Sequence, residues 1–207
     1  MINCRVCDSK ISKIFCNLKK TPLANSYRDL KISIGEEKNF QLKVFFCNNC
    51  KLVQLPEIVF PENIFSNYAY FSSYSNEWLE HSKELCIDSL KEFHIKNDDL
   101  IVEIASNDGY LLKNFKNHNY CNILGIEPAT NIAKFANKQN IRTENIFFND
   151  ETAKYIFNKY NFSKLIFSLN VLAHVPNVKS FVLGKLNDYL TFNLNQNSLI
   201  NAINNKL

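Results

Sequence analysis

Four cysteines near the amino end of the chain stand in two C-x2-C pairs. The pairs are "CRVC" (Cys4, Cys7) and "CNNC" (Cys47, Cys50). Two intervening residues allow both sulfurs of a pair to turn toward one ion, and four thiolates make a closed tetrahedral zinc site. Such a site stabilises a fold and leaves no open position for catalysis. The spacing therefore predicts a structural zinc ion within a small domain over residues 1–60.

Two other interpretations of these pairs stay open, a redox dithiol and incidental cysteines. A redox C-x-x-C is expected at the start of a helix beside a βαβ unit. Cys4 instead lies near a chain end, and Cys47 follows "KNFQLKVFF", which we expect to be a β insertion between the pairs. The remaining cysteines have no partner at ligand spacing, and we expect them to be buried thiols: Cys16, Cys86 and Cys121.

Charge and hydropathy narrow the classes of partner. The formal net charge is +4, and the lysines are scattered without a basic block. A nucleic-acid footprint is normally clustered, so a zinc-ribbon module that binds nucleic acid is disfavoured. No apolar run approaches the ~20 residues that cross a bilayer, and "MINCRVCDSK" has no signal-peptide character. We expect no membrane partner and a cytoplasmic, reducing location, where cysteines more often bind metals than form disulfides.

A second chemical pattern is "VEIASNDGYLL", residues 102–112. It resembles a strand that enters a loop and a helix, and the backbone N–H groups at such a helix start bind anionic ligand groups. Glu127 follows Gly109 at about the 20-residue spacing at which an acid binds both hydroxyls of a ribose. Because the G-x-G-x-x-G motif of dinucleotide enzymes is absent, the loop and Glu103 favour S-adenosylmethionine over NAD.

The loop also has a simpler interpretation. "NDG" is a common turn, and Glu103 could be an ion-pair partner at a strand end. Ala105 stands where such loops usually carry glycine. A methyl group there is tolerated if φ stays negative, although it narrows the pocket.

From residue 99 onward, short apolar strands alternate with helices of about ten residues, which indicates βαβ units and a parallel sheet covered on both faces. We expect strands at 99–106, 122–129, 141–148 and 163–170, and helices at 110–118, 131–140, 151–160 and 178–190. Residues 61–97 form an aromatic-rich and then helical connecting segment, with apolar spacing from Trp78 to Phe93. The fold class is therefore α/β, a small zinc-binding domain followed by a partial Rossmann-like domain.

Seven stretches in order resemble one family, the zinc-containing S-adenosylmethionine-dependent sugar C-methyltransferases, which act on nucleotide-linked deoxyhexoses. Over residues 4–183 these are "CRVC", "PLANSY", "CNNCKLVQL", "NYAYFSSYS", "VEIASNDGYLL", "GIEPATNIA" and "NVLAHVPN". The resemblance implies a class I methyltransferase domain, bound S-adenosylmethionine, structural zinc on the four cysteines and a nucleotide-sugar substrate.

The resemblance also implies roles for single residues. Residues implied to line the S-adenosylmethionine pocket are Glu103, Asn107, Asp108, Gly109, Glu127 at the ribose and Asn170 near the methyl donor. Tyr70 and His174 match positions that face the sugar. C-methylation beside a ketone removes a carbon-bound proton, and Tyr and His can hydrogen-bond the enolate oxygen or carry the proton. Without the resemblance Tyr70 would be interpreted as a core aromatic, and for His174 a functional role and simple hydrogen bonding would both stay open.

The resemblance ends near Gly184, whereas family members continue with further sheet strands, a Tyr-Asp-Glu-His segment that contains the proposed base, and a carboxyl-terminal domain. We therefore expect a truncated methyltransferase domain over residues 98–184 and a divergent, asparagine-rich tail over 185–207. The strand at 163–170 would then end the sheet. Two functions remain open. One is a C-methyltransferase, inactive if the missing half is essential. The other is a non-catalytic zinc- and nucleotide-binding subunit that needs a partner chain to supply the missing strands.

Overall fold

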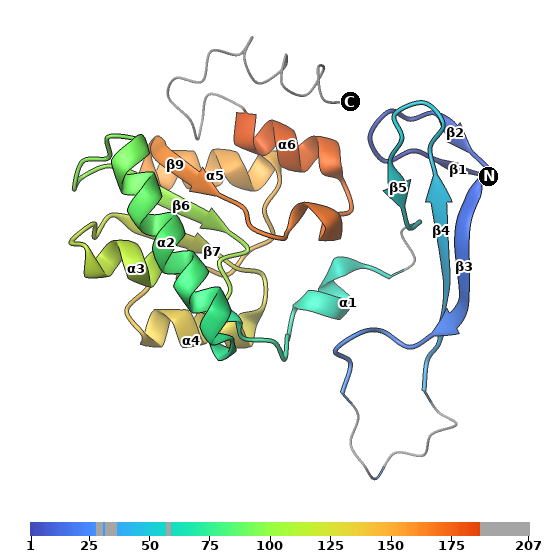
Figure 1. Cartoon of the computed structure of the whole chain (residues 1–207), viewed down its shortest axis with the longest axis horizontal. Coiled ribbons are helices and arrows are strands. Elements are labelled where there is room, and N and C mark those ends of the chain that lie inside the picture. Colours follow the sequence, from blue (N-terminus) through green and yellow to red (C-terminus); the bar gives the residue numbers. More distant parts are fainter. Residues whose placement is uncertain (28–30, 32–36, 57–58, 187–207) are drawn as a thin grey trace. The chain divides into compact units, whose positions relative to one another are not determined.

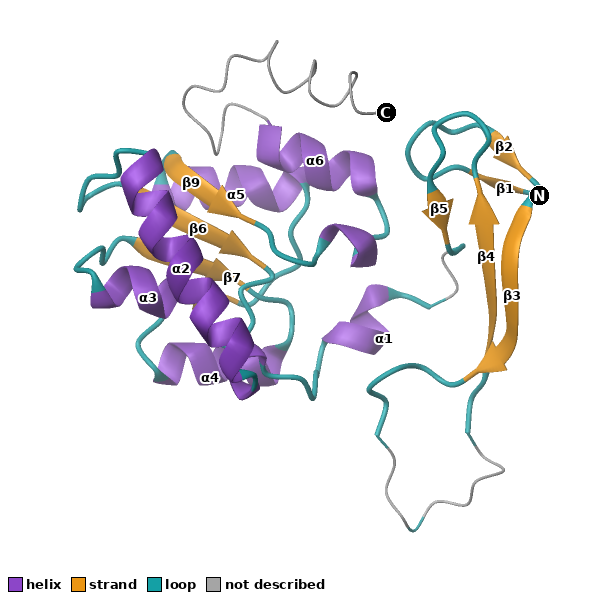
Figure 2. Cartoon of the chain, viewed as in Figure 1, coloured by secondary structure: helices purple, strands orange, loops and turns teal. Residues whose placement is uncertain are grey.

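The computed structural model describes residues 1–27, 31, 37–56 and 59–186 of the 207-residue chain. They form two compact units. Among the described residues, the first comprises Met1–Ile64 with Pro176–Lys179, and the second comprises Phe65–Val175 with residues 180–186. Strands dominate the first unit, and strands alternate with helices in the second (Figure 2). The tail expected over 185–207 lies, from residue 187, outside the described residues.

The described part of the first unit contains two small antiparallel sheets. β1 (Ile2–Asn3) pairs with β2 (Lys10–Ile11), and the larger sheet has the order β3 (Ile14–Thr21), β4 (Phe40–Phe46), β5 (Val53–Gln54). The expected β insertion is β4, and its long partner β3 was not predicted. The strand β3 is mostly exposed and its pairing with β4 shifts register twice, so its sequence lacks the alternation that marks a half-buried strand.

The buried core of the first unit is small. Cys4, Ile11 and Cys47 are its only buried hydrophobic members among the described residues, with half-buried neighbours around them. A core of this size cannot stabilise a unit of about 60 residues without a disulfide, a metal or a partner. The unit therefore needs an additional source of stability, and the cysteines are at its centre.

The second unit is built on a parallel sheet. Its strands are β6 (Leu100–Ile104), β7 (Ile123–Ile126), β8 (Thr143–Glu144) and β9 (Ser163–Phe167), in the order β8-β7-β6-β9. All three pairings are parallel, which confirms the predicted α/β class. Each strand is shorter than predicted, most of all β8, because the chain after Glu144 leaves the ladder.

Helices connect and flank these strands. The α-helices are α1 (Pro61–Phe65), α2 (Asn76–Glu92), α3 (Leu112–Asn117), α4 (Thr130–Lys138), α5 (Asp150–Tyr160) and α6 (Val178–Leu186). The described residues also include two short 3-10 turns, η2 (Ser72–Tyr74) and η3 (Leu172–His174). The predicted helix from residue 178 is α6, and its expected end lies outside the described residues. The described residues contain no helix long and apolar enough to span a membrane.

The alternation of side chains along β6 explains why both faces are covered. Ile101 belongs to a buried cluster with Cys86 of α2 and Phe115 of α3. Its neighbours on β6 point the other way and join a second cluster with residues of α5 and α6: Ala153, Ile156 and Phe181. Figure 1 shows α2 and α5 on opposite faces of the sheet. The prediction of a doubly covered sheet is thus confirmed.

Candidate functional site

Two matched turns hold the four predicted zinc ligands. In the first, Cys4 N donates to Ser9 O (2.9 Å) and Asp8 N donates to Cys4 O (3.1 Å). The second repeats both bonds around Cys47, each at 2.9 Å. The residue after the second cysteine of each pair is left-handed, Asp8 with φ 58° and Lys51 with φ 65°. The repeated geometry shows that the C-x2-C spacing folds into the same turn twice.

The four sulfurs converge on one point. Their ligand atoms all lie within 4.8 Å of one another. Cys4 Sγ is 3.5 Å from Cys50 Sγ, and Cys7 Sγ is 3.6 Å from Cys47 Sγ. Tetrahedral zinc with Zn–S bonds of ~2.3 Å sets its sulfurs about 3.8 Å apart. The arrangement fits a four-thiolate zinc site, as the spacing predicted, and neither pair starts a helix as a redox dithiol would.

Gln54, on β5, is buried beside the sulfurs and was not predicted from the sequence. Its Nε2 donates to Cys4 Sγ (3.4 Å), and its Oε1 accepts from Arg5 N (3.0 Å). An amide donor aimed at a thiolate stabilises the negative sulfur and fixes its orientation. No sequence signal marks this role, because Gln54 lies outside both C-x2-C pairs.

The thiols of the cluster have unequal electrostatic surroundings. Cys7 Sγ is hydrogen-bonded with Ser9 Oγ (3.3 Å), and this contact, together with the Ser9 backbone and Asn49, lowers the pKa of Cys7 to about 5. Burial raises the pKa of Cys50 to about 12. Zinc ligands must be deprotonated. The turn around Cys7 therefore favours the thiolate that zinc requires, whereas Cys50 ionises readily only when a metal compensates its charge.

The three remaining cysteines differ from one another. Cys86 is fully buried, and burial raises its pKa to about 11. Cys16 is half-buried on β3, and Cys121 is exposed shortly before β7. The prediction of buried thiols is therefore correct only for Cys86. It is wrong for Cys121, because that residue precedes the first buried position of its strand.

The loop between β6 and α3 has an unusual backbone. Ala105 (φ 57°), Asn107 (φ 49°) and Gly109 (φ 82°) are left-handed and alternate with residues that are not. Alternation of this kind turns successive backbone N–H groups to one side, which makes a concave site for anionic groups. The condition for tolerating Ala105 was a negative φ, and the structure contradicts it. The alanine sits in a conformation that costs a non-glycine residue roughly 1–2 kcal/mol.

Two glycines allow this loop to approach the neighbouring strands closely. A Cβ atom at Gly109 would lie 2.9 Å from Ile141 Cγ2. A Cβ at Gly125, on β7, would collide with Ser106 Oγ and lie 2.9 Å from Thr143 Oγ1. Gly109 was predicted as a site residue from its position. Gly125 is required because the loop rests directly on β7.

Glu127, the predicted ribose acceptor, already organises the loop. Its Oε2 accepts from Asn107 N (2.9 Å), and its Oε1 accepts from Ala129 N (2.8 Å). Burial raises the pKa of this 5% exposed carboxyl group and outweighs the two N–H donors, which lower it. A carboxylate oxygen can accept more than one hydrogen bond. Both oxygens therefore keep acceptor capacity for ligand hydroxyls, and the ribose role stays a prediction.

Three buried groups at the loop have polar atoms without a hydrogen-bond partner in the described chain. These atoms are both carboxyl oxygens of Glu103, Ser106 Oγ and Asp108 Oδ1. Burial raises the pKa of Glu103 well above its usual range, the nearby Tyr110 hydroxyl offsets part of this rise, and the carboxylates of Asp108 and Glu127 raise the pKa further. Unpaired buried polar atoms are rare and need an explanation. Their concentration here fits a ligand that brings its own hydrogen-bond donors, as the amino group and hydroxyls of S-adenosylmethionine would.

The aromatic segment that contains Tyr70 lies against this loop. Asn107 Oδ1 accepts from Ser72 N (2.8 Å), and Asn107 Nδ2 donates to Tyr70 O (3.2 Å). Asp108 Oδ2 accepts from Ser73 N (3.2 Å). Tyr70 is 47% exposed, so its alternative role as a core aromatic is wrong. The structure thus brings together the loop residues, Glu127 and the segment of Tyr70.

Asn170 and His174 follow β9 and are both exposed. Asn170 is left-handed (φ 53°), and the His174 ring lies edge-on to Phe65 with centroids 5.8 Å apart. They share the carboxyl edge of the sheet with the loop, since carboxyl ends of parallel strands meet there. The described contacts include no hydrogen bond from either side chain to the loop, so their roles also stay predictions.

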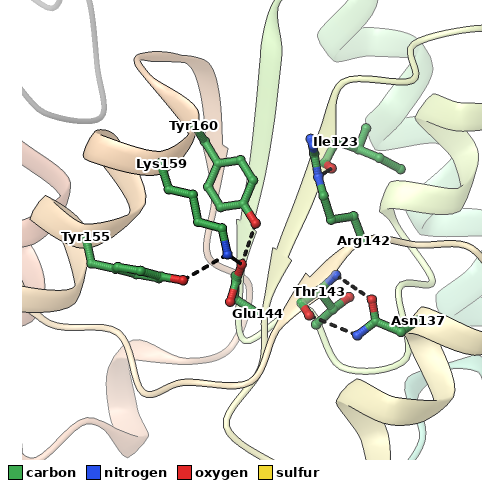
Figure 3. A network of polar contacts seen from close by, with 8 residues as sticks. All are labelled: Ile123, Asn137, Arg142, Thr143, Glu144, Tyr155, Lys159 and Tyr160. Atoms are coloured by element: carbon green, nitrogen blue, oxygen red, sulfur yellow. Dashed lines mark hydrogen bonds and ion pairs between the residues drawn. The ribbon is translucent and has the colours of Figure 1, made fainter.

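A separate polar network fixes β8 beside the site (Figure 3). Glu144 accepts from Lys159 (2.7 Å) and from the Tyr160 hydroxyl. Burial would raise the pKa of Glu144, but these hydrogen bonds lower it. On the other side, the Asn137 carboxamide binds both Thr143 N (3.1 Å) and Thr143 O (2.9 Å). The network binds the edge strand β8 to α4 and α5, and none of these bonds involves the loop after β6.

Comparison with known proteins agrees with the zinc prediction and with the resemblance to C-methyltransferases. Residues 4–65 match the family model Methyltransf_13, described as "Putative zinc binding domain". The chain is 27% identical over 181 residues to the C-methyltransferase NovU of Streptomyces niveus. The aligned residues make up 87% of this chain and 43% of that protein. The chain therefore spans less than half the length of this relative.

A solved structure, a SAM-dependent methyltransferase from Anabaena variabilis, aligns with 57% of this chain and 57% of its own, at a TM-score of 0.40 and 14% identity.

Proposed function

We propose that the chain belongs to an S-adenosylmethionine-dependent C-methyltransferase that acts on a nucleotide-linked keto-deoxysugar in the cytoplasm. The observation that carries the proposal is the loop after β6, where left-handed residues, unpaired buried acceptors and Glu127 gather at one sheet edge. The similarity to a C-methyltransferase over 181 residues supports the reaction type. The sugar rests on the family resemblance alone.

Each site residue has a task that its surroundings support. S-adenosylmethionine supplies an electrophilic methyl group. The concave backbone of the loop suits its carboxylate, and the unpaired oxygens of Glu103 and Asp108 suit its ammonium group. Glu127 has acceptor capacity for the ribose hydroxyls. Zinc on the four cysteines would stabilise the first unit and take no part in the reaction.

The residues proposed to face the methyl-accepting sugar are Tyr70, His174 and Asn170. A ketone becomes nucleophilic at the neighbouring carbon when a proton leaves that carbon and the oxygen is stabilised. The phenol of Tyr70 and the imidazole of His174 can donate hydrogen bonds to that oxygen or carry the proton. The exposure of both side chains leaves them accessible to a substrate.

Calorimetric titration of the purified, zinc-loaded chain with S-adenosylhomocysteine tests the proposal. Saturable one-to-one binding is expected. If the folded, zinc-loaded protein binds no S-adenosylhomocysteine, the loop is an ordinary strand–helix turn and the proposal is wrong. NAD titrated in parallel is the control, since dinucleotide binding would favour the rival cofactor.

A second candidate is a non-catalytic subunit that needs a partner chain. It is supported by the sheet of the described residues, which ends at β9 after four strands. Methyl transfer to a nucleotide keto-sugar by the isolated chain would argue for a self-sufficient enzyme. Transfer that requires an added polypeptide would favour the subunit.

A further inference from the structure

The segment between α1 and α2, Ser66–Ser73, lies on the second unit and is held there without a β-ladder. We call it the strap. Its amino half is bound by α4: Thr130 N donates to Ser66 O (2.9 Å), and the Asn131 carboxamide binds Tyr68 N (3.0 Å) and Tyr68 O (2.7 Å). A carboxamide has one acceptor and two donors, so it can satisfy a backbone as a neighbouring strand would.

The carboxyl half of the strap is bound by the loop after β6. The carboxamide of Asn107 binds Tyr70 O and Ser72 N, and Asp108 accepts from Ser73 N. The bound residues Tyr68 and Tyr70 are two apart, which is the period of an extended chain, and Ser72 begins the 3-10 turn η2. Two asparagines therefore replace a paired strand, one on each half of the strap.

Asn107 differs from Asn131 and Asn137 because its backbone also takes part in the site. Its N–H donates to Glu127 Oε2 (2.9 Å), while its side chain holds the strap. Asn137 clamps Thr143 in the same bidentate way (Figure 3), but it lies on α4 and bonds only to the adjoining strand. Asn107 alone among these three connects the predicted ribose acceptor to the strap through one residue.

We infer that Asn107 is a positioning residue that couples cofactor binding to the strap that carries Tyr70. The inference rests on the proposed function for the cofactor. A ligand that hydrogen-bonds Glu127 fixes the carboxylate, which fixes the left-handed backbone of Asn107 and hence its carboxamide. The strap is then held more firmly, and Tyr70 is placed for the acceptor only when the methyl donor is bound. An asparagine stands here because it tolerates a positive φ, as glycine does, and adds the clamp.

Amide hydrogen exchange of the full-length, zinc-loaded chain tests the coupling. Ser72 N–H reports the Asn107 clamp, and Tyr68 N–H reports the Asn131 clamp. Asn107→Gly keeps the backbone N–H that donates to Glu127 and the positive φ, and each variant is measured at a concentration of S-adenosylhomocysteine that saturates it. Exchange of Ser72 N–H should rise about tenfold, the effect of one lost hydrogen bond. Asn131→Ala is the matched control, and should release Tyr68 N–H instead.

The coupling itself is read from the response to S-adenosylhomocysteine. In the wild type the ligand should slow exchange of Ser72 N–H about fivefold, and in Asn107→Gly it should bind with less than a twofold effect. Asn107→Asp retains the acceptor for Ser72 N and should restore most of the response. A merely structural clamp would protect Ser72 equally with and without ligand, and that result would overturn the inference.

Failure of the proposed function has a different signature. A wild-type chain that binds no S-adenosylhomocysteine refutes the cofactor assignment and, with it, the coupling. In that case only the hydrogen exchange of Ser72 N–H without ligand tests whether Asn107 holds the strap. Equal Ser72 exchange in the wild type and Asn107→Gly would show that Asn107 does not hold the strap.

Discussion

The two units of the chain build their sites from opposite materials. In the first unit, side chains supply the ligands and the backbone only shapes the turns, with Asp8 and Lys51 left-handed so that four sulfurs converge. In the second unit, the backbone of the loop after β6 forms the concave surface, and buried side chains complete it. A site made of side chains is destroyed by one substitution, whereas a site made of backbone is weakened by degrees.

The largest expected effect is loss of the first unit on removal of one zinc ligand. Cys47→Ser replaces one of the four thiolates with a hydroxyl, a poor zinc ligand, so the unit should lose much of the about 10–16 kcal/mol that structural zinc contributes. The small core of the unit cannot replace it. Amide exchange should show β4 unprotected while β6 stays protected, since each unit has its own core.

Cys121→Ser is the matched control, because it removes an exposed thiol outside the cluster. Metal analysis should give one zinc per chain for this variant and for the wild type. A Cys47→Ser protein with full zinc content and a protected β4 would show that the four-sulfur site is not what stabilises the unit.

The next effect is graded and lies in the second unit. Glu127→Gln should weaken S-adenosylhomocysteine binding by about 2 kcal/mol, the scale of a hydrogen bond to a charged group. The change also removes one of the two oxygens that accept from Asn107 N and Ala129 N. Calorimetric titration measures the affinity.

Glu144→Gln serves as the control on the neighbouring strand. This acid bonds Lys159 and Tyr160 rather than the loop (Figure 3). Its substitution should cost under about 1 kcal/mol of stability, as for a partly exposed ion pair, and should leave affinity unchanged. Equal losses of affinity in both variants would mean that the ribose does not bind at Glu127.

The pH dependence of stability sharpens the contrast further. Burial raises the pKa of Glu103 in the folded state above 4.5, so the folded protein binds its proton more tightly than the unfolded chain. Stability of the wild type therefore falls as the pH rises above 4.5 toward that raised pKa. Glu103→Gln does not titrate and should be more stable at pH 8 by about 1–2 kcal/mol, with a smaller difference at pH 5.

Urea unfolding followed by Trp78 fluorescence measures this, since Trp78 is the only tryptophan and lies in α2 of the second unit. The same variant should bind S-adenosylhomocysteine more weakly, which would mark Glu103 as a residue that sacrifices stability for a ligand. Parallel stability curves at pH 5 and 8 would show that Glu103 stays hydrogen-bonded and ionised in solution.

The difference between the units also decides what could be predicted from the sequence. The zinc ligands were predictable because a fixed spacing of one residue type encodes the turn. The parallel sheet was predictable because buried strands are apolar runs, whereas β3 was missed because most of its side chains are exposed. The strap could not be found, since bonds between carboxamides and backbone leave no periodic signal. The expectation of a negative φ at Ala105 was wrong because the loop imposes a left-handed conformation on a residue that disfavours it.

The smallest expected effect tests whether the thiolates alone account for the zinc site. Gln54→Leu removes the amide that donates to Cys4 Sγ, and zinc release to a chelator should accelerate about fivefold, a change of roughly 1 kcal/mol. Gln41→Leu is the control, because Gln41 donates to Asn17 Oδ1 (2.8 Å) on the same sheet and contacts no sulfur in the described structure.

Equal release rates for the two glutamine variants would leave the four sulfurs as the whole site. A selective effect of Gln54 would show that even the side-chain site of the first unit depends on a polar neighbour that its motif does not contain. The two units would then share one rule: the residues that a motif reveals are held in place by buried polar groups that it does not.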